Sequence, residues 1–202
     1  MSGCVAVVPV KAFARAKSRL ASAVPEAERH AFARGCFEHV LSLLEAHPGI
    51  THVMVVSNDP EVLAAARARG HVPLKDPVDA VRLNEVVDSA LALAVEQGAD
   101  AALVLMSDLP LLAPSDLDEL LAGDAALALG PDHASAGTNA LVARPPDLMP
   151  TCFGHPQSFA LHRARAAALG CEARIVVTPG IAGDVDTAED YAQLWRGPSE
   201  AR

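Results

Sequence analysis

Carboxylate side chains in two separate segments are the first candidates for chemistry in this sequence. Asp108 follows the apolar run "LVLM" after a single serine. Asp184 and Asp186 flank Val185 in the segment "AGDVDTAEDY", so in an extended chain both carboxylates project to the same side. Two such groups can share one hard cation through oxygen ligands. Both segments are therefore candidates for a metal site.

Each acidic segment also has a purely structural interpretation. Asp108 could form an Asx turn before Pro110, which is a common use of aspartate. Aspartates that precede a helix often cap its first turn, and this applies to the pair near 184. Thr187 is already a cap candidate there, so the paired aspartates have no evident capping role. That favours cation binding for the second segment.

A cationic loop lies near the start of the chain. The segment "KAFARAKSRL" at 11–20 contains Lys11, Arg15, Lys17 and Arg19, although the protein has a formal net charge of -9. It lacks the glycines of the common phosphate-binding loops. A solvated basic turn is the alternative interpretation. Its isolation in an acidic protein favours binding of a polyphosphate, with lysine as a point charge and arginine as a bidentate fork.

Two polar segments resemble binding turns for an anion. "AGTNAL" places residues 137–139 in a tight polar turn before a strand, and "FGHPQSFALH" places Gly154 and Ser158 around the start of a helix. Exposed N–H groups at a helix N-terminus can bind an anion. His162 lies one turn after Ser158 and could support it, although a lone helical histidine is more often structural. A Ser–His hydrolase is disfavoured because no G-x-S-x-G elbow is present.

Hydrophobic periodicity predicts the elements that must position these residues. Short apolar runs predict strands at 4–10, 51–57, 101–106, 125–129, 139–143 and 173–177. Helical spacing and end signals predict helices at 25–46, 59–70, 84–97, 115–122, 157–169 and 187–195, with "SDLD" opening the helix at 115 and Thr187 opening the last. This alternation predicts a mainly parallel sheet with helices on both faces. Ligands of such sheets bind at the carboxyl ends of the strands, where the cationic loop and the segment of Asp108 fall.

Composition limits the class of protein. With 202 residues, 51% of them apolar and only 3% aromatic, the chain predicts one domain over residues 1–202 with a core of Ala, Val and Leu. A pI near 5.3 argues against a general nucleic-acid binder. The four scattered cysteines fit neither a zinc site nor a disulfide framework. No signal peptide or membrane-spanning segment is evident, so we expect a cytoplasmic protein without a membrane partner.

Taken together, these segments resemble the 2-phospholactate guanylyltransferase family of coenzyme F-420 biosynthesis, a branch of the molybdopterin-nucleotidyltransferase-like fold. The resemblance covers nearly the whole chain. It rests on "VVPVKAFARAKSRL", "SDLPLL", "GTNAL", "FGHPQSFALH" and "DVDTAED", which occur in the family's order. The implied architecture is a three-layer α/β sandwich of the nucleotide-diphospho-sugar transferase type, with a mainly parallel mixed sheet.

The resemblance implies transfer of a guanylyl group from GTP to the phosphate of a small phosphorylated three-carbon acid, with release of pyrophosphate. The acceptor would be 2-phospho-L-lactate, phosphoenolpyruvate or 3-phospho-D-glycerate. The implied roles are nucleotide binding by Lys11, Lys17, Arg19 and Asn84, magnesium binding by Asp108, Asp184 and Asp186, and acceptor binding by Thr138, Gly154 and Ser158. Lys17 and Asp108 would be the catalytic residues.

One residue departs from the family's pattern. Arg82 precedes the Leu83–Asn84 pair where a glycine is expected, so the side chain there would reshape the base pocket or reach a phosphate. Two other functions stay open. They are another metal-dependent nucleotidyl or glycosyl transferase of similar fold, and a nucleotide-binding regulatory module without catalysis. The sequence selects neither an acceptor nor an oligomeric state, and a homodimer stays open.

Overall fold

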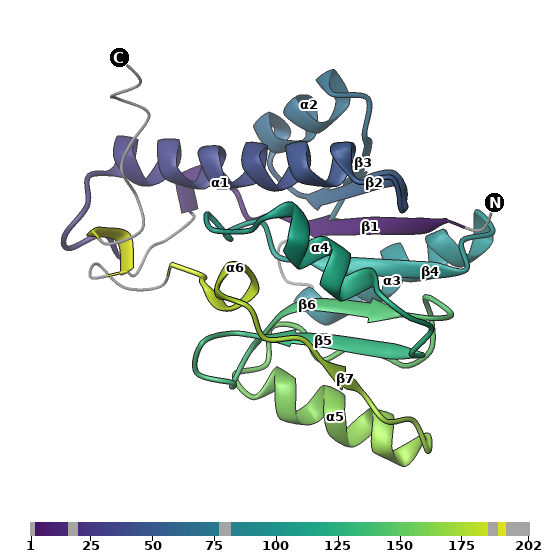
Figure 1. The fold of residues 1–202 in the computed structure, drawn as a ribbon. Coiled ribbons are helices and arrows are strands. Elements are labelled where there is room, and N and C mark those ends of the chain that lie inside the picture. Colours follow the sequence, from purple (N-terminus) through teal and green to yellow (C-terminus); the bar gives the residue numbers. More distant parts are fainter. Residues whose placement is uncertain (1–2, 16–19, 77–81, 186–189, 193–202) are drawn as a thin grey trace.

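A mixed sheet of seven strands runs through the protein (Figure 1). The computed structural model describes residues 3–15, 20–76, 82–185 and 190–192. The strands are β1 (Cys4–Pro9), β2 (Ile50–Ser57), β3 (Val72–Lys75), β4 (Ala101–Leu105), β5 (Leu127–Pro131), β6 (Thr138–Ala143) and β7 (Arg174–Ile175). Their order in the sheet is β3-β2-β1-β4-β6-β5-β7. Only β6 among these strands is antiparallel to its neighbours, which confirms a mainly parallel sheet.

Helices cover both faces of this sheet (Figure 1). They are η1 (Phe13–Arg15), α1 (Glu26–Ala46), α2 (Pro60–Ala68), α3 (Leu83–Glu96), α4 (Pro114–Leu121), α5 (Ser158–Ala168) and α6 (Pro179–Ala182). One apolar layer joins the sheet to α1, α2, α4 and Ile181 of α6, and the other joins it to α3 and α5. The expected three-layer α/β sandwich is therefore confirmed.

Apolar side chains at helical spacing explain the longest helix. On α1 the buried residues are Phe32, Ala33, Cys36, Phe37, Val40, Leu41 and Leu44, which form one stripe against the sheet. The helix α2 begins where the carboxylate of Asp59 accepts a hydrogen bond from the backbone N–H of Glu61 at 2.9 Å. The apolar spacing is the signal by which the sequence predicts α1.

The start of α4 differs from its prediction. The helix begins at Pro114 and its N-cap residue is Ala113, so the cap expected from Ser115 is wrong. The buried carboxylate of Asp116 accepts a hydrogen bond from the backbone N–H of Ala113 at 2.7 Å. Proline at the first helical position needs no N–H partner, which favours this earlier start. The cap expected from Thr187 lies outside the described residues.

Four further elements depart from the expected pattern. The sequence predicts neither the edge strand β3 nor the short helix α6, because neither has an apolar period long enough to read. β3 is a four-residue strand with only partly buried side chains and contains Pro73. β5 begins two residues later than expected, and β7 pairs through Arg174 and Ile175 alone.

The direction of β6 brings its first residues to the carboxyl ends of the parallel strands. Leu105 at the end of β4 pairs with Ala140 of β6. The next backbone N–H along the chain, of Met106, donates to the carbonyl of Asn139 at 2.9 Å. Thr138 and Asn139 therefore lie at the edge where Asp108 leaves the sheet.

Two glycines let α6 dock closely against the sheet and α4. A Cβ on Gly130 of β5 would collide with Cγ2 of Ile181, and one on Gly180 would overlap the carboxylate of Asp116. Ile181 is fully buried in the core. The close approach of α6 fixes the chain that continues to Asp184.

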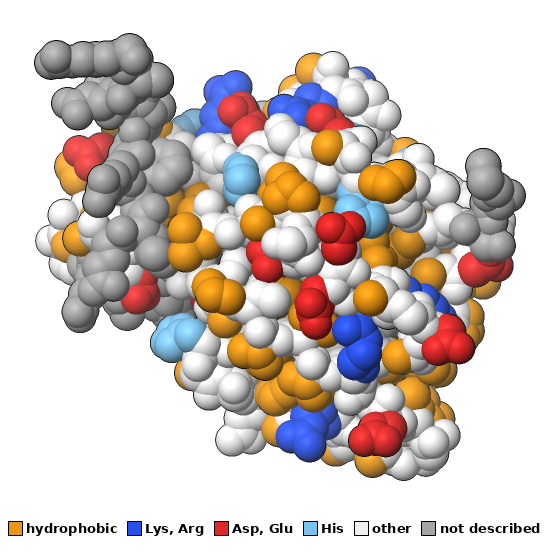
Figure 2. Space-filling view, viewed as in Figure 1, with side chains coloured by type: hydrophobic (Ala, Val, Ile, Leu, Met, Phe, Trp, Pro, Cys, Tyr) orange, Lys and Arg blue, Asp and Glu red, His pale blue; other side chains and the backbone are white. Residues whose placement is uncertain are grey.

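The surface over α4 and α6 carries mixed side chains. In Figure 2 acidic, basic and apolar groups of the described residues are interspersed on this face. No described helix is both long enough and apolar enough to cross a membrane. All four cysteines are free thiols, and Cys4, Cys36 and Cys152 are buried, as expected for small apolar residues.

Docking of α6 generates a testable prediction. Gly130→Ala should lower the free energy of unfolding by about 1–3 kcal/mol, because the added methyl group overpacks the contact with Ile181. In the double variant Gly130→Ala/Ile181→Ala the added methyl group enters the space that the isoleucine side chain vacates. Its loss in free energy of unfolding should therefore be about 1 kcal/mol smaller than the sum of the losses in the two single variants. Urea denaturation of the four proteins measures this coupling. Additive effects would contradict a direct contact between residue 130 and Ile181.

Candidate functional site

The side-chain amide of Asn139 connects one predicted metal ligand to the end of β4. Its Nδ2 donates to Oδ1 of Asp184 at 3.2 Å and to the carbonyl oxygen of Ile181 at 2.9 Å. Its own backbone carbonyl accepts from the backbone N–H of Met106, two residues before Asp108. Asn139 is buried, so its hydrogen bond to Ile181 is protected from water, while its hydrogen bond to Asp184 is partly buried. The structure thus brings the segment of Asp184 to the edge at which Asp108 emerges.

Lys11 and Asp108 follow the ends of two strands that are neighbours in the sheet. β1 and β4 are parallel neighbours, and Val7 pairs with Val104. Lys11 and Asp108 each stand four residues beyond that pair, so both follow adjacent strand ends at one edge. The side chain of Lys11 is exposed, and that of Asp108 is partly buried. A cation and a carboxylate therefore follow the ends of neighbouring strands.

The loop that carries Lys11 is fixed by neighbouring helices. The backbone N–H of Phe13 donates to Oδ2 of Asp59 at 3.2 Å, while Oδ1 of the same carboxylate caps α2. The ring of Phe13 is buried against Phe37 and His30, with centroid separations of 5.6 Å. These contacts anchor the first half of the cationic segment over α1 and α2.

Lys17, Arg19 and Asp186 lie outside the described residues, so their predicted roles stay predictions. The chain neighbours Leu20, which follows Arg19, and Val185, which precedes Asp186, belong to the described residues. Leu20 and Val185 are both fully buried and belong to one small apolar cluster with Val24, Phe32 and Cys36. The chain just after the cationic loop and the chain just after Asp184 therefore pack together.

Oxygen ligands suit a hard cation, and two of the three predicted ligands can be placed. The side chain of Asp184 is 13% exposed, and Nδ1 of His133 lies 3.9 Å from its Oδ1. In the described part of the chain no group of three or more His, Cys, Asp or Glu side chains is arranged to hold a metal ion. Magnesium binding by Asp108, Asp184 and Asp186 therefore stays a prediction, which the carboxylate chemistry fits.

Two predicted acceptor residues meet in a buried hydrogen-bonded chain. Thr138 is the first residue of β6 and Ser158 is the first residue of α5. The hydroxyl of Ser158 donates to Oγ1 of Thr138 at 3.3 Å, and Oγ1 of Thr138 lies 2.9 Å from Nδ1 of His162. All three side chains are buried. Two hydroxyl groups from segments twenty residues apart therefore form one polar pair.

The loop before Gly154 is held from three sides. Its Cys152 N–H donates to Nε2 of His162 at 2.7 Å, and its Thr151 N–H donates to Oδ1 of Asp88 on α3 at 2.9 Å. The guanidinium of Arg165 donates to the carbonyl of Thr151 at 2.9 Å. The loop therefore has little freedom relative to α3 and α5.

Gly154 joins this loop to the start of α3. Its φ of +85° is a conformation that favours glycine, and an added Cβ would lie 3.2 Å from Cβ of Leu83. Leu83 is the first residue of α3, and the predicted nucleotide ligand Asn84 is the second. Arg82 is exposed at the N-cap position, and its backbone N–H points to the carboxylate of Glu85 at 3.4 Å. The predicted acceptor and nucleotide segments are therefore in contact.

Two backbone amides at the start of α5, where the sequence suggests an anion site, donate hydrogen bonds within the protein. The N–H of Ser158 donates to the carbonyl of His155 at 3.0 Å, and that of Phe159 donates to the carbonyl of Ala136 at 3.1 Å. These two amides therefore have partners within the protein, and anion binding at this helix start stays a prediction. The hydroxyl groups of Thr138 and Ser158 are polar groups that the segment also offers.

The polar turn before β6 also differs from its expected position. It is built on Asp132, whose carboxylate accepts hydrogen bonds from the N–H groups of Ala136 at 2.9 Å and Gly137 at 2.7 Å. Thr138 and Asn139 already belong to the strand. The directions of these two side chains are therefore set by the strand and not by the turn.

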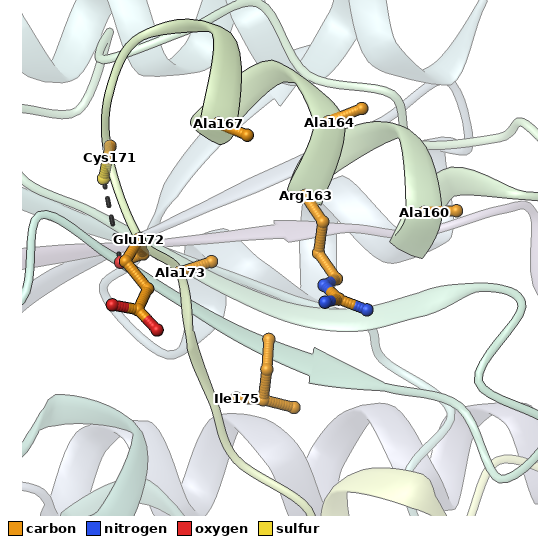
Figure 3. A pocket seen from close by; sticks show the side chains of 8 residues that line it. All are labelled: Ala160, Arg163, Ala164, Ala167, Cys171, Glu172, Ala173 and Ile175. Carbon is orange, nitrogen blue, oxygen red and sulfur yellow. Dashed lines mark hydrogen bonds between the residues drawn. The ribbon is translucent and has the colours of Figure 1, made fainter.

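A shallow groove lies on the other side of α5, away from these residues (Figure 3). It is lined by Ala160, Arg163, Ala164, Ala167, Cys171, Glu172, Ala173 and Ile175. In Figure 3 the side chain of Arg163 extends from the helix toward Ile175. None of the predicted site residues lines this groove. The helix thus presents its polar residues Ser158 and His162 inward and a small-residue face to the groove.

Three residues with evident roles are not among the predicted ligands. They are Asn139, Asp132 and Asp88, each of which bonds a segment distant from it or shapes a turn of the site. Asn139 stands beside Thr138 in "GTNAL", and that adjacency is the one signal the sequence holds for it. Their partners are mainly backbone groups whose positions depend on the folded sheet.

Comparison with known proteins identifies the family. Residues 4–198 match the family described as "Guanylyl transferase CofC like", and the chain belongs to this family. It is 39% identical to the phosphoenolpyruvate guanylyltransferase of Sphaerobacter thermophilus, over 94% of this chain and 91% of that protein. It is 33% identical to the 2-phospho-L-lactate guanylyltransferase of Halorubrum lacusprofundi, over 89% of this chain and 79% of that protein. The resemblance found in the sequence motifs is thereby confirmed.

Solved structures support the fold assignment. A protein of Desulfovibrio desulfuricans G20, described as a nucleotide-diphospho-sugar transferase, superposes with a TM-score of 0.77. The two chains are 19% identical, and the match covers 100% of this chain and 90% of the other. At this identity the likeness concerns the fold alone. The chain has the nucleotidyltransferase type of α/β sandwich.

The buried histidine generates a prediction about pH. Burial, reinforced by the positive charge of Arg165, lowers the pKa of His162 to about 4 from 6.5. Between these values the unfolded chain binds a proton that the folded protein does not, so lowering the pH through this window destabilises the fold. Once the pH has fallen below both values, the pKa difference of His162 has lowered the free energy of unfolding by about 3 kcal/mol, at 1.36 kcal/mol per pH unit.

Urea denaturation between pH 7 and pH 4 measures this effect against a control. His162→Gln has no titrating group at this position, so its free energy of unfolding should fall less steeply with acid than that of the wild type. The difference between the two slopes should approach one proton between the two pKa values. Parallel curves would show that His162 takes up its proton equally well in the folded protein.

Proposed function

We propose that the protein transfers the GMP moiety of GTP to the phosphate of a small phosphorylated three-carbon acid and releases pyrophosphate. The family membership supports guanylyl transfer. Phosphoenolpyruvate is the acceptor to test first, because relatives at 39% and 40% identity carry the name phosphoenolpyruvate guanylyltransferase. 2-Phospho-L-lactate is the second, after the relative at 33% identity. The reaction would serve coenzyme F-420 biosynthesis.

One observation carries this proposal furthest. The amide of Asn139 holds Asp184 beside the end of β4, from which Asp108 emerges, and the residue before it is the predicted acceptor ligand Thr138. We propose that the cation site and the acceptor site, which depend on the consecutive residues Asn139 and Thr138 of β6, are adjacent. Transfer between two phosphates needs that adjacency, since the reacting atoms must approach to about 3–3.5 Å.

Charge repulsion is the main obstacle to this reaction. A phosphomonoester has a second pKa of about 6, so the acceptor oxygen is already a competent nucleophile at neutral pH and needs no general base. Two unit charges about 4 Å apart repel by roughly 4 kcal/mol at an effective dielectric constant near 20. The site must therefore neutralise the phosphates before they can meet.

The cationic segment would supply part of that neutralisation. Lys11, which follows the strand next to that of Asp108, would bind the triphosphate together with Lys17 and Arg19. Lys17 would stabilise the charge that develops at the α-phosphorus. The acceptor oxygen forms its bond to this phosphorus as the bond to the bridging oxygen breaks, and pyrophosphate leaves with the electron pair.

Magnesium is the cofactor we propose for this site. Asp108, Asp184 and Asp186 would hold it, because carboxylates are the ligands that this ion prefers. When bound, the ion would offset the charge of the phosphate oxygens. The chain itself orients Asp184 through Asn139 and positions that segment through the packing of Ile181 and Val185.

A direct assay tests the proposed reaction. Wild-type protein with GTP and magnesium should release pyrophosphate in the presence of at least one of the three acids, phosphoenolpyruvate first. Mass spectrometry should then detect the guanylylated acid. CTP and UDP-sugars serve as alternative donors. Transfer from one of these, or GTP binding without product from any acid, would overturn the proposal in favour of another transferase or a non-catalytic module.

The proposed metal ligand can be tested by a nearly isosteric substitution. Asp108→Asn removes one charge at the end of β4 and should lower kcat by about a hundredfold or more, with the thermal unfolding temperature nearly unchanged. The matched control is Asp147→Asn, which removes the same charge from an exposed residue. It should keep wild-type turnover. Equal turnover of the two variants with magnesium present would exclude Asp108 from catalysis.

A further inference from the structure

His162 forms hydrogen bonds with both segments that contribute predicted acceptor ligands, the start of β6 and the loop before Gly154. It is fully buried on α5, one turn after Ser158. Its Nδ1 lies 2.9 Å from Oγ1 of Thr138 at the start of β6, and its Nε2 lies 2.7 Å from the backbone nitrogen of Cys152. The loop of Cys152 leads within two residues to Gly154. A single imidazole ring therefore connects strand, loop and helix.

The partners of the ring define which nitrogen carries the proton. A backbone amide can only donate, so Nε2 must accept from Cys152 and has no proton. In the neutral ring the proton is then on Nδ1, which donates to the oxygen of Thr138. Burial and the charge of Arg165 lower the pKa of the imidazole to about 4, so this neutral form persists at physiological pH. The ring itself packs edge-on against Phe153, with centroids 5.1 Å apart.

This tautomer leaves one hydroxyl hydrogen of Thr138 and Ser158 available to a ligand. Thr138 accepts from the ring, and Ser158 and Thr138 share one further hydrogen bond at 3.3 Å. The pair has two hydroxyl hydrogens and uses one of them in that bond. In the contacts made by the described residues, the other hydrogen has no acceptor. A histidine that accepted at Nδ1 would instead consume this hydrogen.

We propose that His162 is a positioning residue, which donates from Nδ1 so that the Thr138–Ser158 pair directs its remaining O–H to an oxygen atom of the acceptor. This inference rests on the proposed function and adds the way in which the acceptor is recognised. The ligand class is an anionic oxygen, of a phosphate or a carboxylate, because only an acceptor completes the chain of donors. The second bond, to Cys152, holds the loop of Gly154 at a fixed distance from that hydroxyl pair.

Two substitutions separate the two hydrogen bonds of the ring. His162→Asn places an amide nitrogen near the position of Nδ1, so it keeps a donor for Thr138 and loses the acceptor for Cys152. His162→Gln places an amide oxygen near the position of Nε2, so it keeps the acceptor for Cys152 and loses the donor. Thr138→Ala, alone and combined with His162→Gln, completes a double-mutant cycle.

The expected results concern the acceptor and not the nucleotide. Thr138→Ala and His162→Gln should each lower kcat/KM for the acceptor by about tenfold or more, which is the effect of losing one hydrogen bond to a charged group. The double variant should be no worse than Thr138→Ala within about twofold. His162→Asn should stay within about threefold of the wild type for folded protein, even with a lower unfolding temperature. KM for GTP should change by less than about twofold throughout.

Each contrary result has a definite meaning. Multiplying losses in the double variant, or a loss in His162→Asn as large as that in Thr138→Ala, would reduce His162 to a structural residue and overturn the inference. If His162→Gln does not fold, the comparison of His162→Asn with Thr138→Ala still decides between the two roles. If the wild type transfers no GMP to any of the three acids, the proposed function fails, and the role of His162 toward an acceptor fails with it.

Discussion

The reversed direction of one strand governs which groups can meet at the candidate site. β6 runs antiparallel to β4 and β5, so its first residues lie where the parallel strands end. Thr138 and Asn139, at the beginning of β6, therefore lie at the same end of the sheet as Asp108, which follows the end of β4. Were β6 parallel, those two side chains would lie at the opposite edge of the sheet. The hydrogen bonds from Asn139 to Asp184 and from His162 to Thr138 both depend on this arrangement.

The site combines two kinds of polar environment. Around Asp184 the chain offers carboxylates at a partly exposed edge, which suits a hydrated cation and phosphates. Around His162 it offers neutral donors in a buried setting, where each hydrogen bond is stronger and an unmatched one is costly. The contact of Gly154 with Leu83 joins the second region to the helix that carries Asn84. The groups proposed for charge neutralisation and for acceptor recognition thus both lie near the carboxyl ends of the parallel strands.

The sequence predicts those features that depend on local patterns. Periodic apolar residues mark α1, and a buried apolar run marks β1, because burial of one face dictates the residue types. β3 has no such pattern, since an edge strand with partly exposed side chains is under weaker compositional constraint. The role of Asn139 escapes sequence reasoning because its partners are backbone groups and a carboxylate brought close only by the sheet. The partners of the Ser158 and Phe159 amides escape it for the same reason.

The small apolar cluster of Leu20 and Val185 also bears on how the protein is made. These two residues are separated by most of the chain, yet both are fully buried in one cluster. During synthesis β1, β2 and β4 can pair before Val185 has emerged from the ribosome, whereas the cluster cannot close until then. Contacts between such distant segments form late because the entropic cost of closing the intervening loop comes first. The nascent chain therefore acquires a sheet well before it completes the candidate site.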